Sequence, residues 1–271
     1  ALLLFVPSLY GFRPQGCILC VASRFEEIVI TQWTRENSRA FMPYPDCDVA
    51  HTEDGPLAGL TFSVKDMFDV AGFPTSAGSP TMLAVSGIKT TTARAVQQLL
   101  DAGARFIGKA VTDEFAFSVI GNNAHFGIPV NGAAPDRYAG GSSSGSASSV
   151  SCGLCDFSLG TDSGGSIRGP ASQCGLFGIR PSFGRISLEG CFGLCPPFDT
   201  AGILAADLDV FERATSVLIG KDSQQSKETP RLLIPEDIFE LFGPRVINAV
   251  SDALESAQSL WGHCLLYTSP S

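Results

Sequence analysis

Two serine clusters flanked by glycines constrain this chain more than any other feature of its sequence. Residues Gly140–Gly145 read GGSSSG, and residues Gly160–Arg168 read GTDSGGSIR. Glycine lets the backbone adopt positive φ or approach a ligand closely, and serine hydroxyls can attack a substrate or relay protons. The second cluster ends where a helix can begin, so its amides can converge on an anion or oxyanion. The alternative is that both clusters are flexible polar loops.

The order and spacing of these clusters resemble the serine- and glycine-rich signature of the amidase-signature hydrolases. An upstream segment, Gly59–Asp66 (GLTFSVKD), resembles the lysine-bearing strand of the same family. The resemblance extends roughly over Pro56–Leu208. It is closest to the plant-type indole-3-acetamide amidases, through the segments Asn123–Gly127 (NAHFG) and Phe177–Ser182 (FGIRPS).

The resemblance implies a Ser-Ser-Lys triad that cleaves carboxamides, with Ser166 as nucleophile, Ser142 as bridge and Lys65 as base. The two serines are 24 residues apart (166 − 142), which is the usual family spacing. It also implies a cis peptide before Ser142 and a Ser142 hydroxyl within reach of both Lys65 and Ser166, with no metal or cofactor. Further implied roles are oxyanion donation by Ser163, Gly164 and Gly165, substrate binding by Ala116 and Phe117, and support by Thr161, Asp162 and Arg168.

Several of these assignments have alternatives. Lysine is a base only when neutral, and burial favours the neutral form; the local sequence equally allows a surface Lys65 paired with Asp66. Asp162 and Arg168 suit a structural ion pair at least as well as a direct role. The apolar residues around Phe117 indicate an apolar substrate, or simply core. Two other functions stay open: a noncatalytic receptor domain with this fold, and an amidotransferase subunit acting on glutamyl-tRNA.

Competing motifs are weaker. Gly103–Lys109 resembles a phosphate-binding loop, but Ala110 lacks the hydroxyl that would hold Mg²⁺, and the intervening residues read as a strand. Gly141–Gly145 matches a nucleophile elbow, but no apolar strand precedes it. The three histidines and the two C-x-x-C pairs stand outside catalytic or zinc-binding patterns; they are His51, His125, His263, Cys17/Cys20 and Cys152/Cys155.

The composition and charge of the chain limit the kinds of partner that it can bind. Hydrophobic residues make up 44 % of the 271 residues, charged residues only 17 %, and the net charge is −9 without a basic cluster. Nucleic acid and anionic membranes are therefore poor partners. We expect a small-molecule amide as substrate, and a homodimer is compatible with the sequence. Scattered cysteines favour a reducing, cytoplasmic compartment, although the apolar residues Ala1–Val6 leave targeting open.

The predicted elements alternate between strands and helices, which predicts an α/β protein. With the resemblance, we expect the amidase-signature fold: a mixed, mostly parallel sheet with helices on both faces. We expect residues 1–55 to be poorly defined, 56–263 to form an incomplete amidase domain, and 264–271 to resemble translated adapter sequence on a truncated chain. Strands are expected at 60–64, 105–110, 157–160 and 177–180, and helices at 25–33, 91–102 (capped by residues 90–92), 146–153, 167–174, 207–219 and 245–260.

Overall fold

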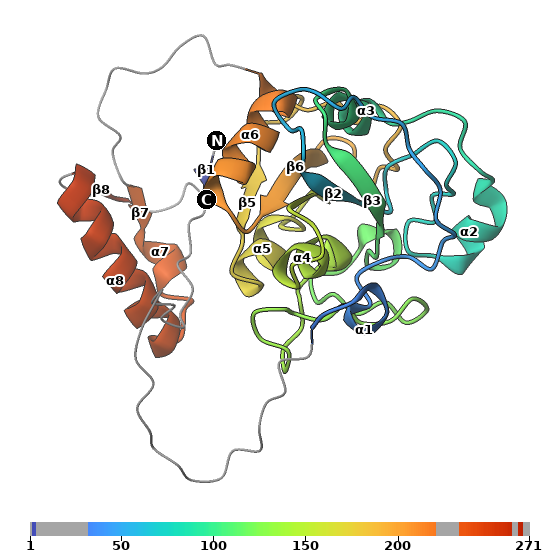
Figure 1. Cartoon of the computed structure of the whole chain (residues 1–271). Helices are drawn as coiled ribbons and strands as arrows, with labels where there is room; N and C mark the ends of the chain where they lie inside the picture. The colour runs from blue at the N-terminus through green and yellow to red at the C-terminus, as the bar shows by residue number, and fades with distance from the viewer. Residues whose placement is uncertain (1, 4–31, 221–232, 262–264, 268–271) are drawn as a thin grey trace. The chain divides into compact units, whose positions relative to one another are not determined.

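A computed structural model of the chain describes residues 2–3, 32–220, 233–261 and 265–267 (Figure 1). The described residues fall into two compact units, one formed by residues 2–3 and 32–220 and one formed by residues 233–261 and 265–267. The first unit contains both serine clusters and Lys65, so it holds every residue to which the sequence assigns chemistry.

A six-stranded sheet forms the centre of the first unit, in the order β1-β5-β6-β4-β2-β3. β2 pairs in parallel with β3 and β4, whereas β6 runs antiparallel to both β4 and β5, and β1 runs antiparallel to β5. β2, β3, β4 and β5 therefore share one direction, which confirms the mixed, mostly parallel sheet. The strands are β1 (Leu2–Leu3), β2 (Thr61–Lys65), β3 (Arg105–Ala110), β4 (Phe157–Asp162), β5 (Phe177–Arg180) and β6 (Thr200–Ala205).

Helices cover both faces of this sheet, as expected for the α/β class. In Figure 1, α3 and α6 lie above the strands and α4 and α5 lie below them. The helical elements of this unit are α1 (Arg35–Ser38), α2 (Pro80–Ser86), α3 (Arg94–Asp101), the 3₁₀ helix η1 (Glu114–Ala116), α4 (Ser144–Ser151), α5 (Arg168–Gln173) and α6 (Leu208–Ile219).

The sheet face toward α3 and α6 is apolar and carries the main core. Phe62 of β2 stacks on Phe157 of β4 with ring centroids 5.3 Å apart, and the edge of Phe106 meets Phe62 at 5.9 Å. Leu99 of α3 and Phe211 of α6 belong to the same buried cluster. Each such buried side chain contributes about 1.5–3 kcal/mol, so this face supplies most of the hydrophobic stabilisation.

The sheet face toward α4 carries hydroxyls in place of large apolar groups. The Ser63 hydroxyl of β2 lies 2.8 Å from Ser149 of α4 and donates to Ser158 of β4 at 2.7 Å. Residues 144–150 of α4 are all buried, although most of them are serine, alanine or glycine. Small side chains let the helix backbone come close to the sheet, and hydrogen bonds satisfy the hydroxyls of Ser63, Ser149 and Ser158. The buried hydroxyls of Ser144 and Ser146 have no such partner.

Most predicted elements are confirmed, with three differences. The predicted helix near residues 91–102 begins at Arg94, and Thr92 does not cap it, because its hydroxyl accepts a hydrogen bond from the Ala71 amide at 3.1 Å. The sequence prediction missed β1, α1, α2 and β6, as well as the shorter elements of the second unit described below. The predicted helix at residues 25–33 lies mostly outside the described residues, and its last two residues, 32 and 33, are not helical.

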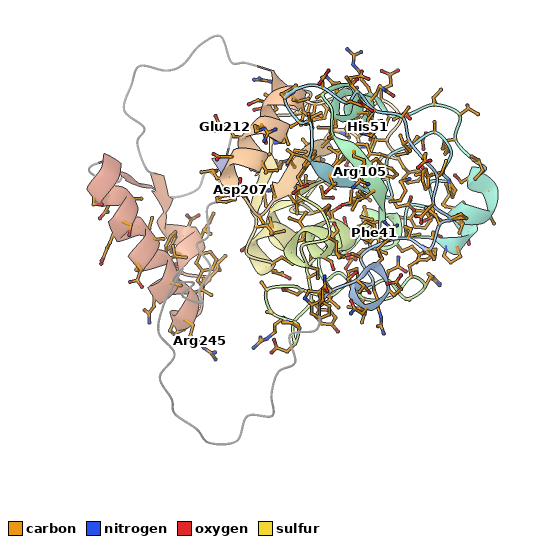
Figure 2. All side chains as sticks on the ribbon, viewed as in Figure 1. Phe41, His51, Arg105, Asp207, Glu212 and Arg245 are labelled. Atoms are coloured by element: carbon orange, nitrogen blue, oxygen red, sulfur yellow. The ribbon has the colours of Figure 1, made fainter. Side chains whose placement is uncertain are left out.

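The second unit contains α7 (Glu236–Phe239), α8 (Pro244–Trp261), β7 (Leu233–Pro235) and β8 (Leu265–Tyr267). β7 and β8 pair in parallel. The long helix was predicted over residues 245–260 and is confirmed within one residue at each end; Arg245, labelled in Figure 2, stands in its first turn.

Candidate active site

The end of β2 delivers Lys65 into a buried polar site. Lys65 follows Ser63 by two positions and therefore faces α4, because side chains alternate along a strand. Its side chain is fully buried. The amine donates to the Ser142 hydroxyl at 2.8 Å and to the Thr161 hydroxyl at 2.8 Å, and it lies 3.4 Å from the Thr161 carbonyl. The surface-lysine alternative is therefore wrong, and the predicted contact with Ser142 is present.

Burial lowers the pKa of Lys65 to about 7, although nearby titratable groups oppose this shift in their ionised forms. Those groups are the Cys191 thiol and the carboxyl groups of Asp113, Asp162 and Asp199. A lysine with an ordinary pKa is almost fully charged at neutral pH. In this site a large fraction of Lys65 is neutral at neutral pH, and only the neutral amine can accept a proton.

The loop before α4 directs the hydroxyls of Ser142 and Ser143 to different partners. The peptide bond between Gly141 and Ser142 is cis, as expected from the resemblance. The Ser142 carbonyl accepts from the Asp113 amide at 3.2 Å, whereas the Ser143 hydroxyl donates to the Thr161 carbonyl at 3.2 Å. A Cβ on Gly141 would lie only 2.2 Å from the Asp113 carboxylate, so the close approach requires glycine at this position.

Ser166 lies in the loop between β4 and α5 and retains 6 % exposure. Its carbonyl accepts from the Ser143 amide at 3.2 Å, which ties the two serine clusters together. Within residues 32–220, no hydrogen bond joins the hydroxyls of Ser142 and Ser166. The contact from Lys65 to Ser142 is thus formed, whereas the predicted contact from Ser142 to Ser166 is not.

Asp162 organises the loop that carries Ser166. Its fully buried carboxylate accepts from Arg168 Nε at 3.0 Å and Nη2 at 3.1 Å, and from the amides of Gly165 at 2.7 Å and Ile167 at 3.1 Å. Burial alone would raise the pKa of Asp162, but the Arg168 and backbone hydrogen bonds outweigh it and hold the pKa below its ordinary value. The structural ion pair between Asp162 and Arg168 is therefore present.

The hydrogen bonds of Asp162 change the predicted oxyanion donors. The Gly165 amide points to Asp162 and is occupied, which removes it from the predicted set in this conformation. Within residues 32–220, no hydrogen bond uses the amides of Ser163, Gly164 or Ser166. Gly165 has a φ of 130°, which favours glycine because other residues rarely adopt it. The loop therefore leaves the amides of Ser163, Gly164 and Ser166 available for a developing oxyanion.

The segment after β3 carries the predicted substrate-binding residues. Ala116 is buried and has a φ of 56°, and Phe115 has a φ of 51°. Phe117 is 81 % exposed and Val119 is 64 % exposed, so these side chains are not core, which corrects that alternative. They form an exposed apolar loop, and no described contact joins Phe117 to Ser166.

Sequence reasoning missed Asp199, which is buried beside the second serine cluster. Asp199 accepts a short hydrogen bond from the Ser163 hydroxyl and two backbone bonds, from Leu194 at 2.9 Å and from Cys195 at 3.0 Å. Thr161, Ser163, Cys191 and Asp199 share the lining of a small cavity. The local signal was weak, because Asp199 precedes β6, a strand that the sequence interpretation did not identify.

The competing motifs do not form the sites that they resemble. Residues 105–110 of the phosphate-loop match are strand β3. Ser143 of the elbow match is buried and follows no strand. His51 is exposed, and His125 lies near the surface, 3.7 Å from Glu114, which confirms the non-catalytic interpretation of both; His263 lies outside the described residues.

A larger cavity, of about 450 Å³, lies away from Ser166 at the edge of β3. Its lining includes Arg35, Phe41 and Arg105, and Figure 2 shows the last two beside β3. The Arg35 guanidinium stacks over the Phe41 ring at 4.2 Å. The lining contains none of Lys65, Ser142 and Ser166, so this cavity is separate from the candidate active site.

Within the described residues, no helix has both the length and the apolar composition needed to cross a bilayer. The described cysteines, histidines and acidic residues also form no group of three or more suited to a metal ion.

Comparisons with known proteins agree with this geometry. Amidase 1 of Oryza sativa subsp. japonica is 45 % identical over 200 residues, which cover 72 % of this chain and 46 % of that protein. The chloroplastic outer envelope protein 64 of Arabidopsis thaliana is 36 % identical, over 78 % of this chain and 36 % of that protein. A crystal structure of an amidase matches with a TM-score of 0.70 and 38 % identity, over 79 % of this chain and 49 % of that one. The chain thus spans about half the length of these relatives, or less.

The family pattern described as Amidase matches residues 33–242, which is more than half of the chain and includes both serine clusters and Lys65. The rice protein exceeds 30 % identity over 72 % of this chain, which points to the same family. On these grounds, the chain belongs to the amidase family.

Proposed function

We propose that this protein hydrolyses small carboxamides to a carboxylic acid and ammonia through an acyl-enzyme on Ser166. One observation carries the proposal: the buried amine of Lys65 donates to the Ser142 hydroxyl at 2.8 Å, in a site where its pKa is about 7. A buried lysine poised near neutral pH suits a general base. A structural role would not require a base of this strength next to two serine clusters.

In the proposed reaction, neutral Lys65 takes the proton of Ser142, and Ser142 takes the proton of Ser166. The Ser166 oxygen then attacks the amide carbon, and the amides of Ser163, Gly164 and Ser166 stabilise the resulting oxyanion. The proton returns through Ser142 to the amine nitrogen, the C–N bond breaks, and ammonia leaves. Water attacks the acyl-enzyme with the same proton relay, which releases the acid and regenerates Ser166.

This mechanism requires a bond from Ser166 to Ser142, which the described conformation lacks. Catalytic hydrogen bonds are often long or poorly aligned in the free enzyme and tighten only with substrate. Ser166 retains some exposure, and its side chain can change rotamer to redirect the hydroxyl. We therefore expect the Ser142–Ser166 bond to form when the amide binds.

The exposed apolar loop that includes Phe117 and Val119 supports an uncharged aryl or alkyl acyl group, with indole-3-acetamide as one candidate. Ammonia release should be measured with indole-3-acetamide, phenylacetamide and short alkyl amides, and with a negatively charged amide of similar size as control. We expect turnover of at least one of the uncharged amides. Preference for the charged amide would contradict this choice of acyl group.

The protein should also react with a fluorophosphonate probe, and peptide mapping should place the adduct on Ser166. This test does not depend on the identity of the substrate. A noncatalytic domain would lack an activated serine and would remain unlabelled under conditions that label a serine hydrolase of known activity.

The labelling rate should depend on pH through Lys65. Because the pKa is lowered to about 7, the neutral base is lost as the pH falls below 7. We expect the rate to fall about tenfold per pH unit below pH 7 and to level off above it. A lysine with an ordinary pKa would instead give a rate that still rises at pH 9. Rates measured from pH 5 to 9 distinguish the two, and a flat profile would contradict the role of Lys65.

A further inference from the structure

A buried aspartate closes the base of the exposed apolar loop that follows β3. Asp113 begins this loop, and its carboxylate oxygen Oδ2 accepts a hydrogen bond from the Gly121 amide at the other end, at 3.0 Å. Asp113 is only 1 % exposed, whereas the side chains of Phe117 and Val119, between the two ends, are mostly exposed. One carboxylate therefore holds together the two ends of the loop to which we assign the acyl group.

The same loop is hydrogen-bonded to the segment that carries Ser142, the proposed bridge. The Ser142 carbonyl accepts from the Asp113 amide at 3.2 Å and from the Thr112 hydroxyl at 3.0 Å. Near the far end of the loop, the Val119 carbonyl accepts from the Gly141 amide at 2.9 Å. The loop thus binds the backbone on both sides of the peptide that joins Gly141 to Ser142.

The loop and the first serine cluster are also in close contact. A Cβ on Gly141 would lie 2.2 Å from the Asp113 carboxylate and 2.8 Å from the Gly121 amide nitrogen, and a Cβ on Gly121 would lie 2.6 Å from the Gly140 carbonyl oxygen. Segments packed this closely cannot move independently, because no space separates them. A change in the position of the loop is therefore passed to Ser142.

Ser142 is also the residue at which the proposed relay is incomplete. Its hydroxyl accepts from the Lys65 amine at 2.8 Å, but among the described residues no hydrogen bond joins it to the Ser166 hydroxyl. The serine that lacks its second contact thus belongs to the same packed unit as the apolar loop. A substrate that contacts Phe117 would act on Ser142 through this unit.

We propose that Asp113 is a positioning residue that couples the binding of an apolar acyl group on the loop to the alignment of Ser142 with Ser166. This inference rests on the proposed function. An acyl group that contacts the loop fixes its position, and the hydrogen bonds of Asp113 and Gly141 pass that position to the bridging serine. Substrate preference then appears in the chemical step and not only in binding.

The test compares two fluorophosphonates that differ only in their chain, one alkyl and one a polar ether of the same length. For each probe, the labelling kinetics of Ser166 give an affinity, KI, and a rate of bond formation, kinact. In the wild type we expect kinact to be about tenfold higher for the alkyl probe, because only this probe engages the loop. In Asp113→Ala the ratio of the two kinact values should fall to about one.

The measurements are made at pH 9 so that the charge of Asp113 does not affect the result. An ionised Asp113 favours the charged form of Lys65, so its removal can only lower the pKa of Lys65 further below about 7. At pH 9 the amine of Lys65 is therefore neutral in the wild type and in the variant alike. Any difference in kinact then reflects position and not the protonation of the base.

Asp113→Asn tests the hydrogen bond without the charge. Asparagine keeps a carbonyl oxygen that can accept from the Gly121 amide. The hydroxyls of Ser118 and Ser144 act on the Asp113 carboxyl group through hydrogen bonding, and a hydroxyl can also accept from an amide group. We expect this variant to restore the tenfold ratio that Asp113→Ala loses, to within about a factor of two.

The matched control is Asp156→Ala, which removes another aspartate that accepts from a backbone amide. The Asp156 carboxylate accepts from the Thr61 amide and the Thr61 hydroxyl, both at 2.7 Å, at the end of β2 opposite to Lys65. This variant should lower the thermal midpoint of unfolding, because two hydrogen bonds are lost. The ratio of the kinact values should stay as in the wild type.

Two results would overturn the inference. If Asp113 has a purely structural role, Asp113→Ala lowers kinact equally for both probes and leaves their ratio unchanged. If the loop only binds the chain, the two probes differ in KI and share one kinact in the wild type. Should Asp113→Ala not fold, Phe117→Ser decides the matter, because that side chain is 81 % exposed and its loss should also bring the ratio to about one. Absent labelling of the wild type by both probes would instead contradict the proposed function itself.

Discussion

Replacing Ser166 with alanine is expected to abolish labelling by the fluorophosphonate and to lower kcat by a factor on the order of 10⁶, the loss typical when a serine nucleophile is removed. Ser166 is the serine that stands beside unoccupied backbone amides and retains exposure to a substrate. The change removes one oxygen from a loop held by Asp162, so folding should be unaffected. Thermal unfolding of the variant, followed by circular dichroism, checks that point.

The matched control is Ser143→Ala in the neighbouring cluster. The Ser143 hydroxyl donates to the Thr161 carbonyl, and no described hydrogen bond joins it to Lys65 or to the Ser166 hydroxyl. We expect this variant to lose some stability, since it leaves a buried carbonyl without that donor, but to retain labelling of Ser166. An adduct on Ser143 in the wild type would instead favour the nucleophile-elbow interpretation of residues 141–145.

Among the variants proposed for this protein, Asp162→Asn should lower the free energy of unfolding the most. One carboxylate oxygen becomes an amide N–H₂ group, which then faces donors of Arg168, Gly165 or Ile167 in place of accepting from them. Breaking a buried ion pair costs about 3–5 kcal/mol. Arg168 keeps 26 % of its side-chain exposure, and water can solvate it in part, so we expect the lower end of that range. The midpoint of unfolding should fall by about 6–12 °C.

Asp136→Asn provides the comparison for Asp162. Asp136 pairs with Arg137 at 3.3 Å, but both side chains are mostly exposed, and such surface pairs contribute little. We expect no measurable change in its unfolding midpoint. If the two variants unfold alike, Asp162 does not organise the Ser166 loop as described above.

The strands of the active site were predictable because their signals are local. β3 and β5 match the predicted ranges to the residue, and β2 carries the apolar alternation that places Lys65 at its end. The sequence analysis missed β6 because Ala201 and Gly202 are small and weak strand formers. β6 is a strand because it pairs with β4 and β5, which lie earlier in the chain and are not visible in its local sequence.

The sequence predicted site positions inside the motifs of the resemblance and not outside them. The resemblance identified Lys65, Ser142 and Ser166 by position, and the structure brings Lys65 and Ser142 together. Asp199 stands outside these motifs, and its contact with Ser163 joins residues more than thirty positions apart. Thr92 shows the opposite case, in which a local signal was misleading. The Thr92 hydroxyl accepts a hydrogen bond from the Ala71 amide, and it does not cap the helix as the sequence predicted.

The hydroxyl-lined face between α4 and the sheet limits how this protein can change over evolution. A Cβ on Gly145 of α4 would lie 2.3 Å from the Ala40 carbonyl oxygen, so a methyl group does not fit there. The phenylalanine-rich face opposite can exchange one large side chain for another of similar volume. Under the proposed function, we therefore expect the serine-lined layer to vary little while the exposed loop after β3 diversifies, so that one reaction could serve different amides.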